Sequence, residues 1–226
     1  MDSVLGALSN KALITVEASH GISLLEGGHT HGDDHDDHED DHDHEAEEHD
    51  HEEGFDPHVW LNPQYAKLQL AAIRDAFSQA DPAGKDYYEA NYEDYAARLD
   101  ALDKRFRETI EALPGRDIVV AHQAFGYLCQ AYGLNQISIE GLRADSEPDP
   151  ARVAEIISLA QEREIKVIFF EELISPKVAQ TIADAIGAET MVLSPVEGLS
   201  SDQQAAGDDY FSVMEQNLEA LSHALS

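Results

Sequence analysis

Four short apolar runs, rich in β-branched and aromatic residues, alternate with helical patterns in the second half of the chain. The runs are IVVAH (118–122), QISIEG (136–141), KVIFFEE (166–172) and ETMVL (189–193). The helical patterns run from Gln123 to about Tyr132, from Pro150, from Pro176 to Ile186 before Gly187, and from about Gly207. Parallel neighbouring strands need a crossover connection, usually a helix, so this alternation is typical of βαβ units. The sequence therefore predicts an α/β fold with a parallel sheet over residues 114–226.

One long helix is predicted directly before this region. Apolar side chains recur at steps of three and four residues: Tyr88, Tyr92, Tyr95, Leu99, Leu102, Phe106, Ile110 and Leu113. This spacing places one apolar stripe along a helix of about thirty residues, on the order of 45 Å long. Because that length exceeds the width of a small domain, we expect residues 81–113 to bridge two lobes and to end at Pro114-Gly115.

Four helix starts share one signature, a capping residue followed by proline. They are Asn62-Pro63, Asp81-Pro82, Asp149-Pro150 and Ser175-Pro176. The cap's side-chain oxygen accepts a free N–H, and proline is tolerated in the first turn. Upstream, the short apolar run LITVEA (13–18) predicts a buried strand. We therefore expect residues 1–80 to form part of an N-terminal lobe and residues 114–226 to form a C-terminal α/β lobe.

The charge of the chain limits its partners. The 226 residues contain 46 acidic and 14 basic side chains, a formal net charge of -32. This argues against nucleic acid or an anionic membrane as partner, and suits a cation-collecting protein or a high-salt habitat. The single cysteine, Cys129, excludes an internal disulfide and a thiolate zinc site. No apolar run reaches the length of a membrane helix, and residues 1–19 lack the features of a signal peptide.

A histidine- and acid-rich tract occupies residues 28–53. It contains fourteen carboxylates, no lysine or arginine, and eight histidines: His29, His31, His35, His38, His42, His44, His49 and His51. Composition alone favours a solvated, self-repelling loop. The close His-x-His pairs favour metal binding instead, because a flexible chain can gather two or three imidazoles and a carboxylate around one ion. Ordering the loop costs entropy, so micromolar sites are expected. We interpret the tract as an accessory metal-binding loop.

Four histidines lie outside the tract. His58 stands in GFDPHVWLNP, just before a helix start, and His122 stands in VVAHQAFGYL, at the carboxyl end of a predicted strand. Ligands in open α/β sheets bind outside the carboxyl ends of strands, and imidazole is the commonest zinc ligand. His20, in a loop, and His223, on a polar helix face, are interpreted as ordinary surface residues.

Four segments give His58 and His122 a context. DPHVWLNP, VVAHQAFGYLCQAYGL, FFEELISPKVAQTIADAIGAE and GDDYFSVMEQNLEAL follow one another along the chain. In this order, and with the histidine-rich loop before them, they resemble the zinc-specific solute-binding proteins of bacterial metal ABC importers, the ZnuA-type proteins. The resemblance runs from about residue 10 to the end. It implies two α/β lobes bridged by one rigid helix, and Zn²⁺ held between them as transported cargo. It also implies a periplasmic or extracytoplasmic monomer that passes zinc to an ABC permease without chemical turnover.

The resemblance also assigns residues. His58 matches the family's second histidine ligand, His122 matches its third, and Glu171 matches a carboxylate that we expect to contact a ligand rather than the metal. The related manganese binders carry Glu where His122 stands and Asp at about Pro195. Nitrogen donors favour zinc over manganese, which prefers oxygen.

The chain departs from the family at its start. The family's first histidine ligand comes from an N-terminal stretch that has no match in this sequence, so an N-terminally truncated protein with an incomplete N-terminal lobe is expected. Two protein ligands are fewer than ordinary zinc sites have. We therefore expect the site between the lobes to bind zinc much more weakly than in a full-length relative.

Two alternatives belong to other functional classes. A truncated, stand-alone zinc buffer or chaperone would act mainly through residues 28–53, and an upstream reading frame continuing into a signal peptide would argue against it. A zinc hydrolase is disfavoured, because the sequence has no HExxH motif and no general base near His58 or His122. We therefore predict that the chain is not an enzyme. An adhesin-like surface role, found among relatives of this fold, is neither supported nor excluded.

Overall fold

A computed structural model describes residue 10 and residues 13–27, 54–142, 149–171 and 175–226. The histidine-rich tract, with all eight of its histidines, lies outside the described residues. So does most of the N-terminal stretch before residue 13.

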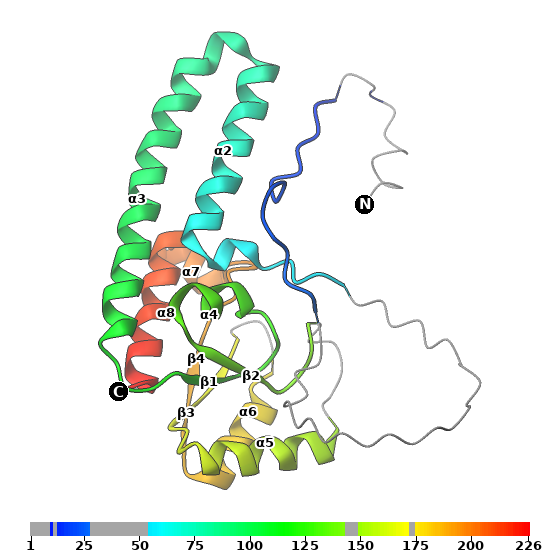
Figure 1. The fold of residues 1–226 in the computed structure, drawn as a ribbon, viewed down its shortest axis with the longest axis vertical. Helices are drawn as coiled ribbons and strands as arrows, with labels where there is room; N and C mark the ends of the chain where they lie inside the picture. The colour runs from blue at the N-terminus through cyan, green and yellow to red at the C-terminus, as the bar shows by residue number, and fades with distance from the viewer. Residues whose placement is uncertain (1–9, 11–12, 28–53, 143–148, 172–174) are drawn as a thin grey trace, which may run out of the picture.

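A four-stranded parallel sheet forms the centre of the second half of the chain. Its strands are β1 (Asp117–Val120), β2 (Asn135–Ser138), β3 (Val167–Phe170) and β4 (Glu189–Val192). They lie in the order β2-β1-β3-β4, and every neighbouring pair is parallel (Figure 1). The prediction of an α/β fold with a parallel sheet is confirmed. All four strands end earlier than predicted, so His122 and Glu171 lie just beyond the last paired residues of β1 and β3.

Helices cover both faces of the sheet. They are α4 (Gly126–Tyr132), α5 (Pro150–Glu162), α6 (Lys177–Ile186) and α8 (Tyr210–Ala224), whereas the short helix α7 (Ser201–Ala206) has no buried residue. In Figure 1, α5 and α6 lie below the sheet, and α4 and α8 lie above it. Successive residues of β1 follow this division, since Val119 joins the core against α5 and α6 while Ile118 and Val120 join the core against α4 and α8. The sheet is therefore covered by helices on both faces, which is typical of parallel sheets.

The long helix rises beside this α/β unit as one arm of a helical hairpin. After α2 (Pro63–Ala80) and a short 3-10 turn (Pro82–Gly84), α3 spans Lys85–Glu111, 27 residues and about 40 Å in length. Its lower half packs on α8 and α4 through the buried residues Ala96, Leu99, Leu102, Phe106 and Ile110. The predicted stripe is confirmed in this half. Above Ala96 the helix is more open, since Tyr95 is 43% exposed and Tyr87, near the upper end, is 69% exposed.

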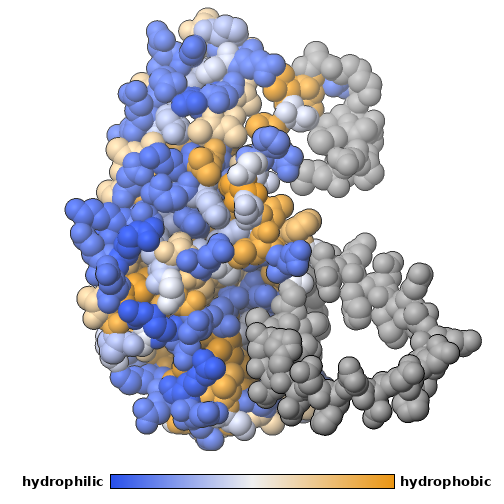
Figure 2. All heavy atoms as spheres, viewed as in Figure 1, coloured by the Kyte–Doolittle hydropathy of each residue, from blue (hydrophilic) through white to orange (hydrophobic). Residues whose placement is uncertain are grey.

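Several local predictions are wrong. Residues 13–18 form no strand; Leu13, Ile14 and Val16 are exposed, and the nearest pairing is a single antiparallel bridge between Glu26 and Phe55. Figure 2 shows apolar side chains at the surface along this N-terminal segment and beside α2. A strand needs a neighbour to pair with, and within the described part of the chain none lies beside residues 13–18.

Two of the four predicted helix caps are also wrong. Asn62 and Asp149 accept the N–H groups of Gln64 and Ala151, as predicted. The Asp81 carboxylate instead accepts the Tyr88 hydroxyl, at 3.0 Å, and the 3-10 turn after Asp81 has no side-chain cap. Helix α6 starts at Lys177 after Pro176, also without one. The short helix α7 was not predicted; Ser200 caps it by accepting the N–H of Gln203. No helix among the described residues is long and apolar enough to cross a membrane.

Candidate metal centre

His58 is held in place by a buried carboxylate two residues before it. The Oδ1 atom of Asp56 accepts both the backbone N–H of His58, at 2.9 Å, and its ring Nδ1, at 2.7 Å. Both residues are buried. A Cβ atom on Gly126, the first residue of α4, would lie 2.8 Å from Asp56 Oδ2, so the lack of a side chain there lets the carboxylate approach the helix. With Nδ1 bound to Asp56, the ring presents Nε2 outward.

His122 is likewise oriented by a carboxylate, that of Glu171 just after the neighbouring strand. It follows β1, and Glu171 is the first residue after the neighbouring strand β3. The carboxyl ends of β1 and β3 lie side by side, and His122 Nδ1 forms a buried hydrogen bond with Glu171 Oε1. A carboxylate on one ring nitrogen fixes the ring orientation and makes the other nitrogen a better metal ligand. Glu171 thus contacts the ring from behind and leaves Nε2 of His122 free to bind a metal.

The structure brings the two histidines together and adds a third group. Their ring centroids are 5.4 Å apart, although all of α2, α3 and β1 lie between the two residues in the sequence. Glu197, in the loop after β4, approaches them, with its Oε1 atom 3.0 Å from His58 Nε2. One donor atom from each of His58, His122 and Glu197 lies within 4.8 Å of the other two. Adjacent donors around a tetrahedral zinc ion are separated by about 3.3 Å, so these three groups could bind one ion after small shifts.

Glu197 was not predicted from the sequence. The related manganese binders carry an Asp ligand at about Pro195, and proline has no side-chain ligand. One signal points to its loop but not to its side-chain direction: SPVEG follows the carboxyl end of β4, in the same parallel sheet as β1. His20 is exposed, and His223 is an exposed residue that contacts Glu189 at 3.2 Å. Neither lies in this group of donors.

The electrostatics of the centre favour a cation. Asp56, Glu171 and Glu197 each contact one of the two imidazoles. Burial by itself lowers the pKa of His58, but hydrogen bonds and charges from Asp56 and Glu197 outweigh it and raise the pKa above its ordinary value. A proton on His58 and a divalent cation beside it satisfy the same carboxylates, so the two compete. Two imidazoles and one carboxylate are a donor set suited to zinc.

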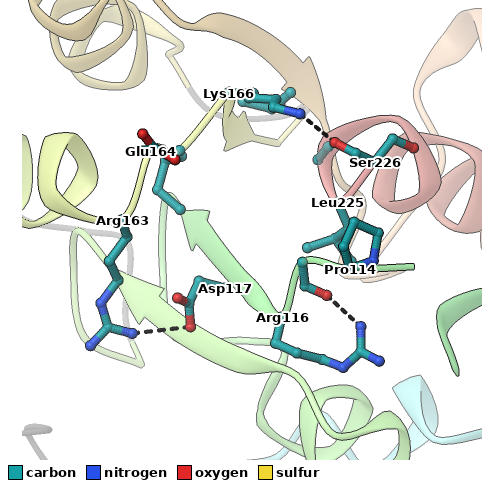
Figure 3. A pocket seen from close by; sticks show the side chains of 12 residues that line it. Pro114, Arg116, Asp117, Arg163, Glu164, Lys166, Leu225 and Ser226 are labelled. Atoms are coloured by element: carbon teal, nitrogen blue, oxygen red, sulfur yellow. Dashed lines mark hydrogen bonds and ion pairs between the residues drawn. The ribbon is translucent and has the colours of Figure 1, made fainter. Parts of the chain in front are cut away.

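Two hollows elsewhere do not offer a comparable site. One, of about 270 Å³, lies at the opposite edge of the sheet, where β1 and β3 begin (Figure 3). Its cations are already paired: Arg163 with Asp117 at 3.0 Å, Lys166 with the Ser226 carbonyl, and Arg116 with the Leu113 carbonyl at 2.6 Å. The Arg163 pair joins the end of α5 to the start of β1, and the Lys166 bond joins the residue before β3 to Ser226, beyond the end of α8, as the dashed lines in Figure 3 show. The other, of about 390 Å³, lies between α2 and α3 and is lined mainly by aromatic and aliphatic side chains.

Comparison with known proteins gives consistent matches. The family described as "Zinc-uptake complex component A periplasmic", ZnuA, matches residues 1–224. The high-affinity zinc uptake system protein ZnuA of Bacillus subtilis is 44% identical over 212 residues, which are 94% of this chain and 64% of that protein. The zinc-binding lipoprotein AdcA of Streptococcus pneumoniae is 40% identical over 218 residues, 96% of this chain and 42% of that protein. The chain therefore spans less than two thirds of the length of either relative.

Solved structures agree with these matches. The Zn(II)-bound ZnuA-like domain of Streptococcus pneumoniae AdcA superposes with a TM-score of 0.77 at 34% identity, covering 99% of this chain and 74% of that one. The metal-dependent lipoprotein YcdH of Bacillus subtilis superposes with a TM-score of 0.73 at 39% identity, covering 93% of this chain and 70% of that one. Both likenesses include the α/β unit and the helical hairpin, since they extend over nearly the whole chain.

Proposed function

This chain belongs to the ZnuA family of zinc-uptake complex components, and from that premise we propose that it binds Zn²⁺ for uptake through His58, His122 and Glu197. The observation that carries the proposal is the mutual geometry of these three residues, with one donor atom from each within 4.8 Å of the others. Asp56 and Glu171 support it by fixing the Nδ1 side of each ring. No step of bond making or breaking is assigned to the site.

The wider role follows from the relatives. We propose an extracytoplasmic protein, monomeric when it carries zinc, that passes the ion to an ABC permease. Residues 81–113 would then form the inter-lobe helix, 114–226 the C-terminal lobe, and 1–80 part of the N-terminal lobe. The tract at 28–53 would act as an accessory zinc-collecting loop near His58. Glu197 raises the number of candidate protein ligands above the two expected from the sequence, which moves the expected affinity upward.

A direct test separates the centre from the tract. Trp60 is the only tryptophan, and its ring centroid lies 5.4 Å from that of His58, so its fluorescence reports on the centre. Zinc titration should change this fluorescence at one ion per chain, and His58→Ala and His122→Ala should each remove the change. The exposed His223→Ala is the matched control and should leave it intact. If zinc binds the chain without altering Trp60 fluorescence, the tract alone holds the metal, and the stand-alone buffer is the better account.

A further inference from the structure

The loop that carries Glu197 has an unfavourable backbone turn. Val196, the residue directly before Glu197, has a φ of 55°, in the left-handed region. A β-branched residue rarely adopts this region, and such strain costs on the order of 1–3 kcal/mol. It persists only where neighbouring groups hold the chain in place. The direction of the Glu197 side chain depends on this turn, so the groups that hold the turn also determine where the carboxylate points.

One buried side chain of α8 holds the start of the turn from both sides. Asn217 Oδ1 accepts the Ser194 N–H at 2.8 Å, and Asn217 Nδ2 donates to the Ser194 carbonyl at 2.8 Å. Both residues are buried. The Ser194 hydroxyl then accepts the Val196 N–H at 3.3 Å. A continuous series of hydrogen bonds thus leads from α8 through Ser194 to the residue before Glu197.

A second contact ties the same loop to the histidine side. Trp60 Nε1 donates to the Pro195 carbonyl at 2.8 Å, and the Trp60 carbonyl accepts the Tyr210 hydroxyl at 2.7 Å. Tyr210 and Asn217 both belong to α8. The helix therefore supports the segment that follows His58 and the segment that precedes Glu197. The relative position of these two donors is set by one rigid element.

Asn217 is an unusual choice for its place in the helix. Its buried neighbours in α8 include Met214, Leu218 and Leu221, all apolar and part of the main core. A buried amide costs free energy unless its groups are bonded, and an apolar residue would fill this space without that cost. Both amide groups of Asn217 bond to Ser194, three positions before Glu197, and Nδ2 also lies 3.9 Å from the Met214 sulfur. This arrangement indicates a role in the loop rather than in packing.

We propose that Asn217 is a positioning residue for zinc: by bracketing Ser194 it maintains the Val196 turn that directs the Glu197 carboxylate towards His58. This inference rests on the proposed function, because Glu197 must contact the ion for its direction to matter. Loss of groups that orient a metal ligand typically lowers metal affinity 10–100-fold. Asn217→Ala should therefore weaken zinc binding by at least about tenfold, although Asn217 touches neither the ion nor a histidine.

The experiment is a double-mutant cycle between Asn217→Ala and Glu197→Gln in the full chain, with zinc affinity measured by Trp60 fluorescence. Val213→Ala, a buried change in the same helix, controls for loss of stability, and thermal unfolding is measured for every variant. We expect Asn217→Ala and Glu197→Gln each to lower the affinity, Val213→Ala to leave it unchanged, and the double variant to bind no more weakly than Glu197→Gln alone. Such non-additivity marks two residues acting through one group.

Each other outcome has a distinct meaning. Unchanged affinity in Asn217→Ala, or a double variant that loses the full product of the two effects, overturns the positioning role while leaving the proposed function in place. If the unsubstituted chain shows no zinc-dependent change at Trp60, the proposed function fails, and the inference fails with it. Should Asn217→Ala not fold, Ser194→Ala decides instead. It removes only the hydroxyl that accepts the Val196 N–H, and it should lower zinc affinity in the same direction but less.

Discussion

Replacing Asp56 tests how the structure prepares His58 for a metal. In the unsubstituted chain, Asp56 Oδ1 accepts the His58 backbone N–H at 2.9 Å and the ring Nδ1–H at 2.7 Å. Asp56→Asn keeps an oxygen in this position. The ring therefore keeps its tautomer and orientation. The substitution removes only the negative charge beside Nδ1. In the unsubstituted chain this charge makes Nε2 a stronger metal ligand. Asp56→Ala removes both the charge and the two hydrogen bonds.

The expected magnitudes follow from these contacts. Loss of an outer carboxylate typically weakens metal binding 10–100-fold, or about 1.4–2.7 kcal/mol. Because Asn preserves the geometry, we expect Asp56→Asn near the lower limit and Asp56→Ala near the upper one. Asp56→Ala also leaves two buried donors of His58 without a partner, each worth about 1–3 kcal/mol of folding stability. It should therefore unfold at a clearly lower temperature, whereas Asp56→Asn should not.

Zinc titrations followed by Trp60 fluorescence measure the affinities, and thermal unfolding measures the stabilities. Asp184→Asn makes the same change of charge on the exposed face of α6 and serves as the control. If the zinc affinity of Asp56→Asn lies within twofold of that of the unsubstituted chain, the Asp56 charge has no effect on metal binding and this expectation is wrong.

Four further results are expected. The pKa of His58 is raised, so on acidification the zinc affinity should begin to fall at a pH above the ordinary histidine range, and His58→Gln should abolish this part of the pH dependence. In the metal-free protein, charged His58 should stabilise the fold fully below about pH 6.5, and this stabilisation should be lost as the pH rises through the raised pKa. Glu171→Gln should lower zinc affinity by about tenfold through His122, without changing the one-ion stoichiometry at Trp60. Burial raises the pKa of Cys129 to about 12, so a thiol reagent should modify the folded chain at pH 8 only as fast as the chain unfolds. Phe106→Ala, which removes a fully buried ring from the interface of α3 with the core, should lower the free energy of unfolding by about 3–5 kcal/mol in a denaturant titration.

The parallel sheet could be predicted because short β-rich runs alternate with helical patterns, and parallel neighbouring strands need such crossover helices. The same reasoning placed His122 at the carboxyl edge of the sheet, whereas Glu171 was assigned through the resemblance to the zinc-specific solute-binding proteins. The lower half of the long helix followed from its spacing. In each case the apolar pattern arises from residues close together in the sequence that face one buried surface, so a single sequence shows it.

Features that depend on distant partners could not be predicted. The apolar run at residues 13–18 has strand composition, but pairing requires a neighbour that composition does not supply. Asp81 is a good capping residue, yet the Tyr88 hydroxyl takes its carboxylate. Glu197 reaches His58 only through the left-handed turn at Val196, which Asn217 holds from α8. A valine in that conformation gives no signal in the sequence, and this is why the third donor was missed.

We propose that His58, His122 and Glu197 jointly bind one zinc ion. The most direct test is anomalous diffraction at the zinc absorption edge from crystals of the full chain grown with one equivalent of Zn²⁺. We expect a single strong peak about 2.0–2.2 Å from His58 Nε2, His122 Nε2 and a Glu197 carboxylate oxygen. Zinc bound to other residues, with His58 Nε2 still hydrogen-bonded to Glu197 and no peak between them, would contradict this proposal.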